Sequence, residues 1–403
     1  MTTIAILGAG MVGTTTALAL QARGHDCVLI DRKPPGRETS YGNAGILQAE
    51  AMLPYALPYR PFDLLRMALG HRNAVRLNWR GLGGQLPGLL RYLHASLPAN
   101  MARIGPLWRE MIAEAMAGHD LLARDAGAEG LIRATGYWEV FATPATFAEG
   151  VARAKALRDE YGVASEILDP AGFARAEPAV TGETAGAVLW AGPRSCSDPG
   201  GLVAAYARMF QDRGGRLVQA DADDLSPDGS GWRVARERAE RVVLSLGPWS
   251  PGVLASFGYR VPMVRKQGYH RHFRAAAMPT RPVMLSHQSA VLSPMSAGLR
   301  IATAVELPGR PLPDHRQLRR AEAAARRLMD IGAPVEETPW TGTRPCLPGM
   351  LPLVMQAPRH RGLWLNFGHG HQGFTLGPAT ADRLARAMEG DTAAIAGLDR
   401  GLW

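Results

Sequence analysis

The hydrophobic pattern at the N-terminus predicts a strand, a helix and a second strand within the first 31 residues. Residues 4–7 form a short apolar run, and the apolar positions of residues 14–23 recur at helical spacing. Residues 27–30 form a second apolar run, which ends on Asp31. The turn between the first strand and the helix consists of Gly8, Ala9, Gly10, Met11, Val12 and Gly13. This order of elements is typical of a βαβ unit that binds a dinucleotide.

The three glycines of this turn have separate functions in such a unit. Gly8 permits the tight turn, Gly10 lets the backbone approach a pyrophosphate, and Gly13 lets the helix lie close to the strand. The phosphates would lie at the helix N-terminus, where free N–H groups favour anions. Asp31 is placed to hold an adenosine ribose and would repel a 2′-phosphate, so the pattern predicts NAD or FAD rather than NADP. An ordinary βαβ turn without a ligand is the alternative.

Beyond Asp31 the pattern continues as a series of strands and helices. Strands are expected at residues 136–141, 186–190, 216–220, 232–234, 241–246, 261–273, 283–291, 298–306 and 362–366. Helices are expected at residues 151–161, 198–211, 316–329 and 378–388. Residues 61–133 are expected to be helical, with breaks at residues 81–84 and at Pro87, Pro98 and Pro106. The chain therefore interleaves buried βα segments with segments of helix and antiparallel sheet.

Two short glycine-rich stretches are candidates for ligand contact. Residues 38–46 are mostly small and polar, so their backbone N–H groups could line an extended ligand; a plain surface turn is the alternative. Residues 368–373 contain three glycines and follow the last predicted strand. A nucleotide domain whose last strand and helix come from the C-terminal region is common when the ligand is as long as FAD. The sequence alone does not choose between FAD and NAD at this point.

Composition and charge exclude several classes of protein. The 403 residues, 46% hydrophobic and 20% charged, are typical of a globular protein with two domains. The net charge is +9, and almost all of the positively charged side chains are arginines, because Lys33, Lys155 and Lys266 are the only lysines. The arginines are dispersed rather than gathered in a basic stripe, so we expect no nucleic-acid partner. Arginine and leucine occur together at residues 64–66 and 89–92, which leaves a membrane-surface contact open beside a solvated helix face.

No targeting segment is recognisable. The first residues lack the basic and apolar regions of a signal peptide, and no apolar run of about 18 residues is present. Cys27, Cys196 and Cys346 are odd in number and scattered, so we expect reduced thiols and no metal site. We therefore expect a cytoplasmic protein, with peripheral attachment to the inner face of the cytoplasmic membrane as an open alternative. The oligomeric state does not follow from the sequence.

Five motifs, in order along the chain, make this sequence resemble the flavin-dependent amine and D-amino-acid oxidoreductases. This group contains glycine oxidase, sarcosine oxidase and D-amino acid dehydrogenase, and the chain is most similar to the last branch. The motifs are the glycine turn and residues 40–45, 266–270, 340–345 and 368–380. The resemblance spans nearly the whole length. It implies an α/β fold, α+β overall, with a Rossmann-like FAD-binding domain in discontinuous segments and a substrate domain with a mixed or antiparallel sheet and helices.

The resemblance also implies domain boundaries and a non-covalently bound FAD. The FAD-binding domain would comprise residues 1–65, 186–262 and 340–403, and the substrate-binding domain residues 66–185 and 263–339. The ADP half would lie on the glycine turn and Asp31. Further cofactor contacts are expected from Arg32, Thr39, Ser40, Asn43, Ala44, Gly45, Ile46, Ala222, Gly247, Gly370, His371, Gln372, Gly373, Phe374 and Thr375. Backbone N–H groups of the last six residues would stabilise negative charge on the flavin.

Four side chains are expected at the substrate. Arg344 matches the arginine that holds the substrate carboxylate in this family, and a guanidinium suits a carboxylate because it donates two parallel hydrogen bonds. A structural ion pair is the alternative. Tyr269 and His270 match a wall of the substrate pocket, although a core histidine is an equal alternative for His270. His371 stands where glycine oxidase has arginine, and Cys346 is expected to be a packed thiol rather than a covalent flavin link.

The activity implied by the resemblance is oxidative deamination of a D-amino acid to the 2-oxo acid and ammonia. Hydride would pass from Cα to flavin N5, and the electrons to a quinone or another acceptor that is not oxygen. A glycine- or sarcosine-type oxidase, and an amine oxidase or dehydrogenase for D-hydroxyproline or opines, are the alternatives. Further alternatives are an NAD-dependent dehydrogenase and a non-catalytic module that binds flavin or nucleic acid.

Overall fold

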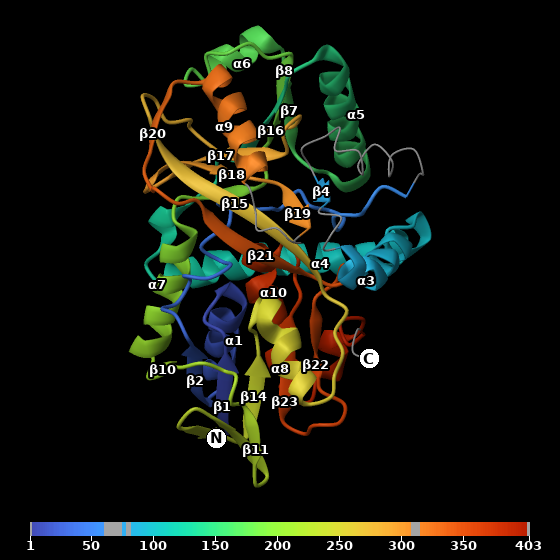
Figure 1. The fold of residues 1–403 in the computed structure, drawn as a ribbon, viewed down its shortest axis with the longest axis vertical. Coiled ribbons are helices and arrows are strands. Elements are labelled where there is room, and N and C mark those ends of the chain that lie inside the picture. The colour runs from blue at the N-terminus through green and yellow to red at the C-terminus, as the bar shows by residue number, and fades with distance from the viewer. Residues whose placement is uncertain (1, 60–74, 78–81, 308–314, 401–403) are drawn as a thin grey trace.

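A six-stranded sheet forms one half of the molecule (Figure 1). The computed structural model describes residues 2–59, 75–77, 82–307 and 315–400. Within them, neighbouring strands of this sheet are parallel except for the antiparallel pair β22 and β23. Its strands, in spatial order, are β10 (Arg216–Gln219), β2 (Asp26–Asp31), β1 (Thr3–Leu7), β14 (Arg241–Leu244), β23 (Leu363–Phe367) and β22 (Leu353–Gln356).

Both faces of this sheet are buried, which explains why its central strands are apolar without alternation. Ile4 and Ile6 of β1 belong to a core with four helices, α1 (Met11–Gln21), α4 (Pro98–Asp125), α7 (Pro199–Asp212) and α10 (Gly373–Met388). Ala5 and Leu7 point to the other face, into a core with α8 (Ser250–Ser256) and a three-stranded sheet. That sheet consists of β11 (Ser226–Asp228), β12 (Gly231–Val234) and β13 (Glu237–Ala239).

A larger sheet of 11 described strands forms the other half of the molecule (Figure 1). In spatial order it contains β4 (Val75–Leu77), β19 (Val305–Leu307), β15 (Val264–Ala275), β18 (Gly298–Ala302), β17 (Ala290–Met295), β16 (Val283–Leu285), β6 (Tyr137–Phe141), β8 (Gly186–Trp190) and β7 (Ser165–Leu168). Two further strands, β20 (Ile331–Pro334) and β21 (Trp340–Cys346), pair with β15. The helices of this half are α5 (Pro144–Tyr161), α6 (Pro170–Ala176) and α9 (Arg316–Leu328).

Two helices, α3 (Leu82–Ala95) and α4 (Pro98–Asp125), lie across the middle of the view in Figure 1. The break expected at Pro98 is confirmed, because α3 ends at Ala95 and α4 begins at Pro98. The other expected breaks in these helices are absent: α3 includes residues 82–84 and continues through Pro87, and α4 continues through Pro106. A proline removes one helical hydrogen bond, but α4 buries residues of one face against α10, which outweighs that loss. Residues 60–74 and 78–81, on which part of the helical prediction falls, lie outside the described residues.

Several other expected elements differ from the structure. The helix expected at 151–161 begins at Pro144, and β4 lies within the segment expected to be helical. The strand expected at 283–291 is a hairpin of β16 and β17, and the one expected at 298–306 is divided into β18 and β19. The C-terminal helix, expected from Pro378, begins five residues earlier at Gly373, so that Pro378 lies inside α10. The remaining short elements are β3 (Ile46–Leu47), β5 (Ile132–Arg133), β9 (Arg194–Cys196) and the 3-10 helices Glu129–Leu131, Gly247–Trp249 and Thr392–Ile395.

The expected domain boundaries stay a prediction, but hydrogen bonding refines them at two strands. Both β8 and β21 fall within segments assigned to FAD binding, and both pair with strands of the larger sheet. Cys27, Cys196 and Cys346 are buried and free. Among the helices of the described ranges, none has the length and apolarity needed to cross a bilayer.

Candidate active site

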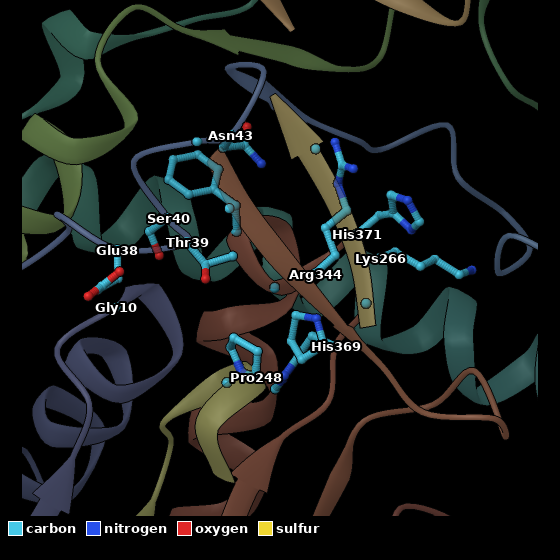
Figure 2. Close-up of a pocket in the computed structure, with 18 of the residues that line it drawn as sticks. Gly10, Glu38, Thr39, Ser40, Asn43, Pro248, Lys266, Arg344, His369 and His371 are labelled. Carbon is cyan, nitrogen blue, oxygen red and sulfur yellow. The ribbon is translucent and has the colours of Figure 1, made fainter. Parts of the chain in front are cut away.

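A cavity of about 1250 Å³ extends from the glycine turn of the six-stranded sheet to β15 and β21 of the larger sheet. Gly8 and Asp31 line one part of it, and Arg344 and His371 line another. Pockets for drug-sized ligands usually measure about 300–1,000 Å³, so this cavity suits a longer molecule. In Figure 2, Gly10 and the labelled residues of the 38–43 loop lie on one side of this space, and Arg344 of the larger sheet lies on another.

The glycines of the turn are required by close contacts. Gly8 has φ +106, and a Cβ there would lie 2.5 Å from the Ser245 carbonyl oxygen. A Cβ on Gly13 would lie 1.7 Å from the carbonyl oxygen of Gly8, so α1 approaches β1 too closely for any side chain at this position. Gly10, just before α1, lines the cavity together with Met11 and Val12, the first two residues of the helix. Gly13 instead allows the close packing of α1 on β1. The N-terminus of α1 therefore opens directly onto the cavity.

Asp31 closes the glycine turn by hydrogen bonds as well as facing the cavity. Its Oδ2 accepts from the N–H of Ala9 at 2.7 Å and its Oδ1 from the N–H of Lys33 at 2.9 Å. Burial raises the pKa of Asp31, and these two N–H donors partly oppose the shift. The Ser40 hydroxyl accepts from the N–H of Met11 at 2.9 Å, which ties the residue 38–46 loop to the start of α1.

Further side chains at this end were not singled out one by one in the sequence, although Glu38 belongs to the candidate stretch at residues 38–46. Glu38 lines the cavity and forms ion pairs with Arg32 at 3.0 Å and Lys33 at 2.9 Å. The Arg32 guanidinium lies 4.4 Å from the ring centre of Trp249, which also lines the cavity. Ala222 and Gly247, expected from the resemblance, line the cavity, as do their neighbours Ala220, Asp221, Asp223 and Pro248.

The loop at residues 39–46 is held in shape from within and from behind. Thr39, Ser40, Asn43, Ala44 and Ile46 line the cavity. Gly45, with φ +70, does not line the cavity but packs against the chain behind the loop. A Cβ on Gly45 would lie 2.4 Å from the Cys196 carbonyl oxygen. Buried Arg300, which was not anticipated, donates to the carbonyl oxygens of Tyr41 at 2.8 Å and Asn43 at 2.6 Å.

The start of α10 forms the wall opposite this loop. Gly370, His371, Gly373 and Phe374 line the cavity. The two other expected residues act behind them: Gln372 donates to the Gln48 side chain at 2.8 Å, and the Thr375 hydroxyl accepts from the Gln48 N–H at 3.3 Å. The first free N–H groups of α10 thus lie at the cavity, where they favour negative charge on a ligand.

His119 of α4 supports this helix terminus. In an α-helix the carbonyl of Phe374 would accept from the N–H of residue 378, and Pro378 has none. The Nε2 of buried His119 lies 2.9 Å from the Phe374 oxygen and 3.0 Å from the Thr375 oxygen, so it donates in place of the missing N–H. A Cβ on Gly118 would lie 2.6 Å from the Pro378 ring, so this glycine makes room for it. The His119 hydrogen bonds and the contact of Gly118 with Pro378 therefore fix α10 to α4.

Replacing His119 by Phe should lower the free energy of unfolding by about 1–3 kcal/mol, since a buried carbonyl loses its donor. His119→Gln should lose less because its amide can still donate. Chemical denaturation of the holoprotein, with exposed His94→Phe as a matched control, measures the difference. An unchanged denaturation midpoint for His119→Phe would show that the His119 hydrogen bond is dispensable.

Arg344 on β21 is half-buried and lines the cavity. Its Nη1 donates to the Ala304 carbonyl at 2.9 Å and its Nη2 to the Thr303 carbonyl at 3.0 Å. It lies over Gly268, where a Cβ would be 2.5 Å from Nη1. Burial lowers the pKa of Arg344, but a guanidinium stays protonated in proteins. No carboxylate of the described residues pairs with it, so a structural ion pair does not account for its position there.

Gln48, Tyr55 and Tyr137 complete this end of the cavity, and the sequence did not point to them. The ring centres of Tyr55 and His371 are 5.3 Å apart. Burial, followed by the charges of Arg344 and Lys266, holds the pKa of His371 well below its usual value, so the ring is neutral. Buried Glu50 lies behind Gln48 and Tyr137 and accepts from both at 3.0 Å. Burial raises the pKa of Glu50 to about 7.

Tyr269 and His270 do not share a wall of the cavity, because adjacent residues of a strand point to opposite faces. Tyr269 contributes to the lining, but its hydroxyl donates to Glu306 at 2.7 Å and its ring lies in the core beneath α9. His270 is buried and stacks on Trp340 at 4.8 Å. Burial, then the charges of Arg300 and His272, lowers the pKa of His270 to about 2. The geometry therefore favours a core role for His270.

Trp340 was missed as a site residue although it lies in a quoted motif. Its ring lines the cavity and fills the space beside two glycines, since a Cβ on either Gly42 or Gly342 would lie 1.9 Å from it. The signal in the sequence was a tryptophan two residues before a glycine and four before Arg344, but Gly42 lies far away along the chain. Only the folded chain shows this contact.

Comparison with known proteins places the chain in a family. The family model DAO, described as FAD dependent oxidoreductase, matches residues 3–387. The chain belongs to this family. It is 30% identical over 404 residues to a D-amino-acid oxidase of Bradyrhizobium diazoefficiens, covering 96% of this chain and 95% of the relative. It is 28% identical over 412 residues to a D-amino acid dehydrogenase of Dechloromonas aromatica, covering 96% and 97%.

Solved structures agree with the fold of the DAO family. Glycine oxidase from Bacillus cereus superimposes with a TM-score of 0.70 at 18% identity, covering 100% of this chain and 98% of that one. The expected α/β fold with a Rossmann-like part and the expected family are thus confirmed. The chain is an FAD-dependent oxidoreductase, and the choice of FAD over NAD is settled by the family match.

The cavity of this DAO-family protein fits FAD by its length and its charges. The glycine turn and the open N-terminus of α1 suit a pyrophosphate, and Asp31 lies where a ribose hydroxyl would be held. The start of α10 suits the electron-rich end of the flavin. When bound, FAD supplies the hydride acceptor of the reaction.

Proposed function

We propose that this protein oxidises the Cα–N bond of a D-amino acid or a related secondary amine. A primary amine would give the 2-oxo acid and ammonia. The observation that carries the proposal is the position of Arg344, a half-buried cation that lines the cavity without an acidic partner among the described residues. A carboxylate is the group that such a guanidinium binds most strongly.

The names of the relatives support an amino acid as the substrate. Both are enzymes of D-amino acids, and each is matched over nearly its whole length. One is named as an oxidase and the other as a dehydrogenase, so the names support no particular electron acceptor. We retain a quinone or another acceptor that is not oxygen as the proposed acceptor.

The residues of the chain would act by position and charge. Arg344 binds the carboxylate and so fixes Cα, while the carbonyl oxygens of Thr303 and Ala304 fix Arg344. Neutral His371 and Tyr55 close the cavity beside it without adding charge. The substrate must present a neutral amine, whose lone pair assists the departure of hydride. The reaction requires no catalytic base, and we assign none.

The decisive experiment mixes the purified holoprotein anaerobically with D-alanine, D-proline, D-aspartate, D-glutamate, glycine and sarcosine and follows the flavin absorbance. We expect a D-amino acid to bleach the flavin fastest. Reoxidation is then compared with oxygen and with a quinone or dye acceptor, and peroxide is measured. Fast peroxide formation would overturn the proposed acceptor, and no bleaching by any amine would overturn the proposed function.

A peripheral membrane contact stays a proposal that the surface of α3 supports. Leu86 and Leu90, four residues apart on this helix, are 46% and 59% exposed, and Leu97 beyond its end is 38% exposed. Such a row of exposed leucines suits an interfacial contact, where a membrane quinone would be within reach. Cosedimentation with anionic liposomes tests it.

A further inference from the structure

The cavity contains a second cation, Lys266, close to Arg344. Lys266 of β15 stands directly opposite Arg344 of β21 in the antiparallel register, so both side chains leave the same face of the sheet. Both line the cavity, and Lys266 is only 6% exposed. In Figure 2 the two side chains start from neighbouring strands and end apart. The substrate end of the cavity therefore carries two positive charges.

Nothing in the described residues neutralises Lys266. Its ammonium lies 4.1 Å from the ring centre of Tyr92, and no carboxylate of the described ranges pairs with it. Like charges directly opposite each other on paired strands are unfavourable, and a desolvated cation is costly unless an anion is bound beside it. The arrangement is thus suited to the arrival of negative charge.

The acidic residues that line the cavity lie elsewhere. They are Asp31, Glu38, Asp221 and Asp223, all beside the glycine turn or the strands next to it. Glu50, behind the wall at the substrate end, has a pKa raised by burial to about 7, so only about half of it is ionised at neutral pH. An anion that enters near Arg344 and Lys266 therefore meets two cations and little opposing charge.

The two cationic groups diverge, which suits two anionic groups on one molecule. The Arg344 guanidinium turns over Gly268 toward the carbonyls of residues 303 and 304, whereas the Lys266 ammonium turns toward Tyr92 on α3. A single carboxylate held by both parallel donors of Arg344 leaves the Lys266 ammonium unused. A ligand with a second carboxylate would use both.

We propose that Lys266 binds a second carboxylate of the substrate, so that the preferred substrates are dicarboxylic amino acids such as D-aspartate or D-glutamate. This inference rests on the proposed function. It names a substrate class that neither the family nor the names of the two relatives specify. The amides D-asparagine and D-glutamine, which match the acids in shape, are the natural comparison.

Anaerobic flavin reduction by each acid and its amide tests the proposal. In the wild type we expect kcat/KM for the better acid to exceed that of its amide at least about tenfold, since hydrogen bonds to charged groups contribute about 1.5–3 kcal/mol. Lys266→Met should remove most of this ratio, and Lys266→Arg should retain part of it. Lys155→Met, at an exposed lysine of α5, should leave the ratio unchanged. An acid-to-amide ratio near one in the wild type, or unchanged in Lys266→Met, would overturn the proposal.

Binding of unreactive acids separates this inference from the proposed function. Glutarate and butyrate, which carry two carboxylates and one, are titrated into the oxidised holoprotein, and the flavin spectrum reports the Kd. We expect glutarate to bind at least about tenfold more tightly, and Lys266→Met to abolish the difference. If glutarate binds in this way but no amine bleaches the flavin, only the proposed function fails. If amines bleach the flavin but Lys266→Met slows only the reoxidation step, Lys266 serves the electron acceptor and the inference fails.

Discussion

Arg344→Met should retain FAD and lose at least about 100-fold in kcat/KM for its amino acid, because two hydrogen bonds to a charged group are lost at about 1.5–3 kcal/mol each. The guanidinium lies at the substrate end of the cavity, while the glycine turn and Asp31 that suit the ADP half lie at the other. Flavin absorbance of the purified variant and anaerobic reduction kinetics measure the two parts of this expectation separately.

Two further variants make the Arg344 experiment specific. Arg344→Lys keeps the charge but not the parallel donors, so its kcat/KM should fall between those of the wild type and Arg344→Met. Arg359→Met removes an exposed arginine that also donates to a backbone carbonyl, that of Gly258, and should behave as the wild type. Turnover by Arg344→Met at the wild-type rate would remove Arg344 from the substrate site.

Gly13→Ala should weaken FAD retention and lower the free energy of unfolding by about 1–3 kcal/mol or more, since overpacked sites have costs of this order. The new Cβ would lie 1.7 Å from the Gly8 carbonyl oxygen and 3.3 Å from the Ser245 side chain. Neither backbone carbonyls nor the end of a buried strand can move aside cheaply, so α1 must shift away from β1. The N-terminus of α1 would then be displaced from the cavity, which weakens its contact with the pyrophosphate of FAD.

Flavin content after dialysis and chemical denaturation of the apoprotein measure both effects of Gly13→Ala. Gly83→Ala is the matched control, because it adds the same methyl group to an exposed position of α3 with no atom within 4 Å. That variant should be as stable as the wild type or slightly more so, since alanine favours helix. Full FAD content and unchanged stability in Gly13→Ala would contradict the close packing of α1 on β1.

The N-terminal βαβ unit could be predicted to within three residues at every boundary. Expected strands at 4–7 and 27–30 correspond to Thr3–Leu7 and Asp26–Asp31, and the expected helix to Met11–Gln21. Each signal is local: apolar period, glycine spacing and a terminal acid lie within a few turns of chain. The hairpin at β16 and β17 was missed because its turn, at residues 286–289, lacks glycine and proline.

The site was predicted less well than the fold. The motif around Arg344 was recognised, but Lys266 and Trp340 were not chosen, because each depends on a partner far away along the chain. Glu38 was not chosen either, although its partners Arg32 and Lys33 lie only five to six residues away. Tyr269 and His270 were assigned together by resemblance, although the two-residue period of a strand separates them. The two-residue period could have been applied to the sequence. The sequence does not show, however, which face of the strand lies toward the cavity.

The sequence by itself determined the glycine turn, the acid after the second strand and the alternation of buried βα segments with antiparallel ones. These follow from short-range sterics and periodicity, which the chain carries with it wherever it folds. The tertiary structure decided that helices continue through Pro87 and Pro106, that His119 replaces the N–H missing at Pro378, and that β15 pairs with β21 in a register that sets Lys266 opposite Arg344. Packing and strand register depend on residues tens to hundreds of positions apart, and only the folded chain brings them together.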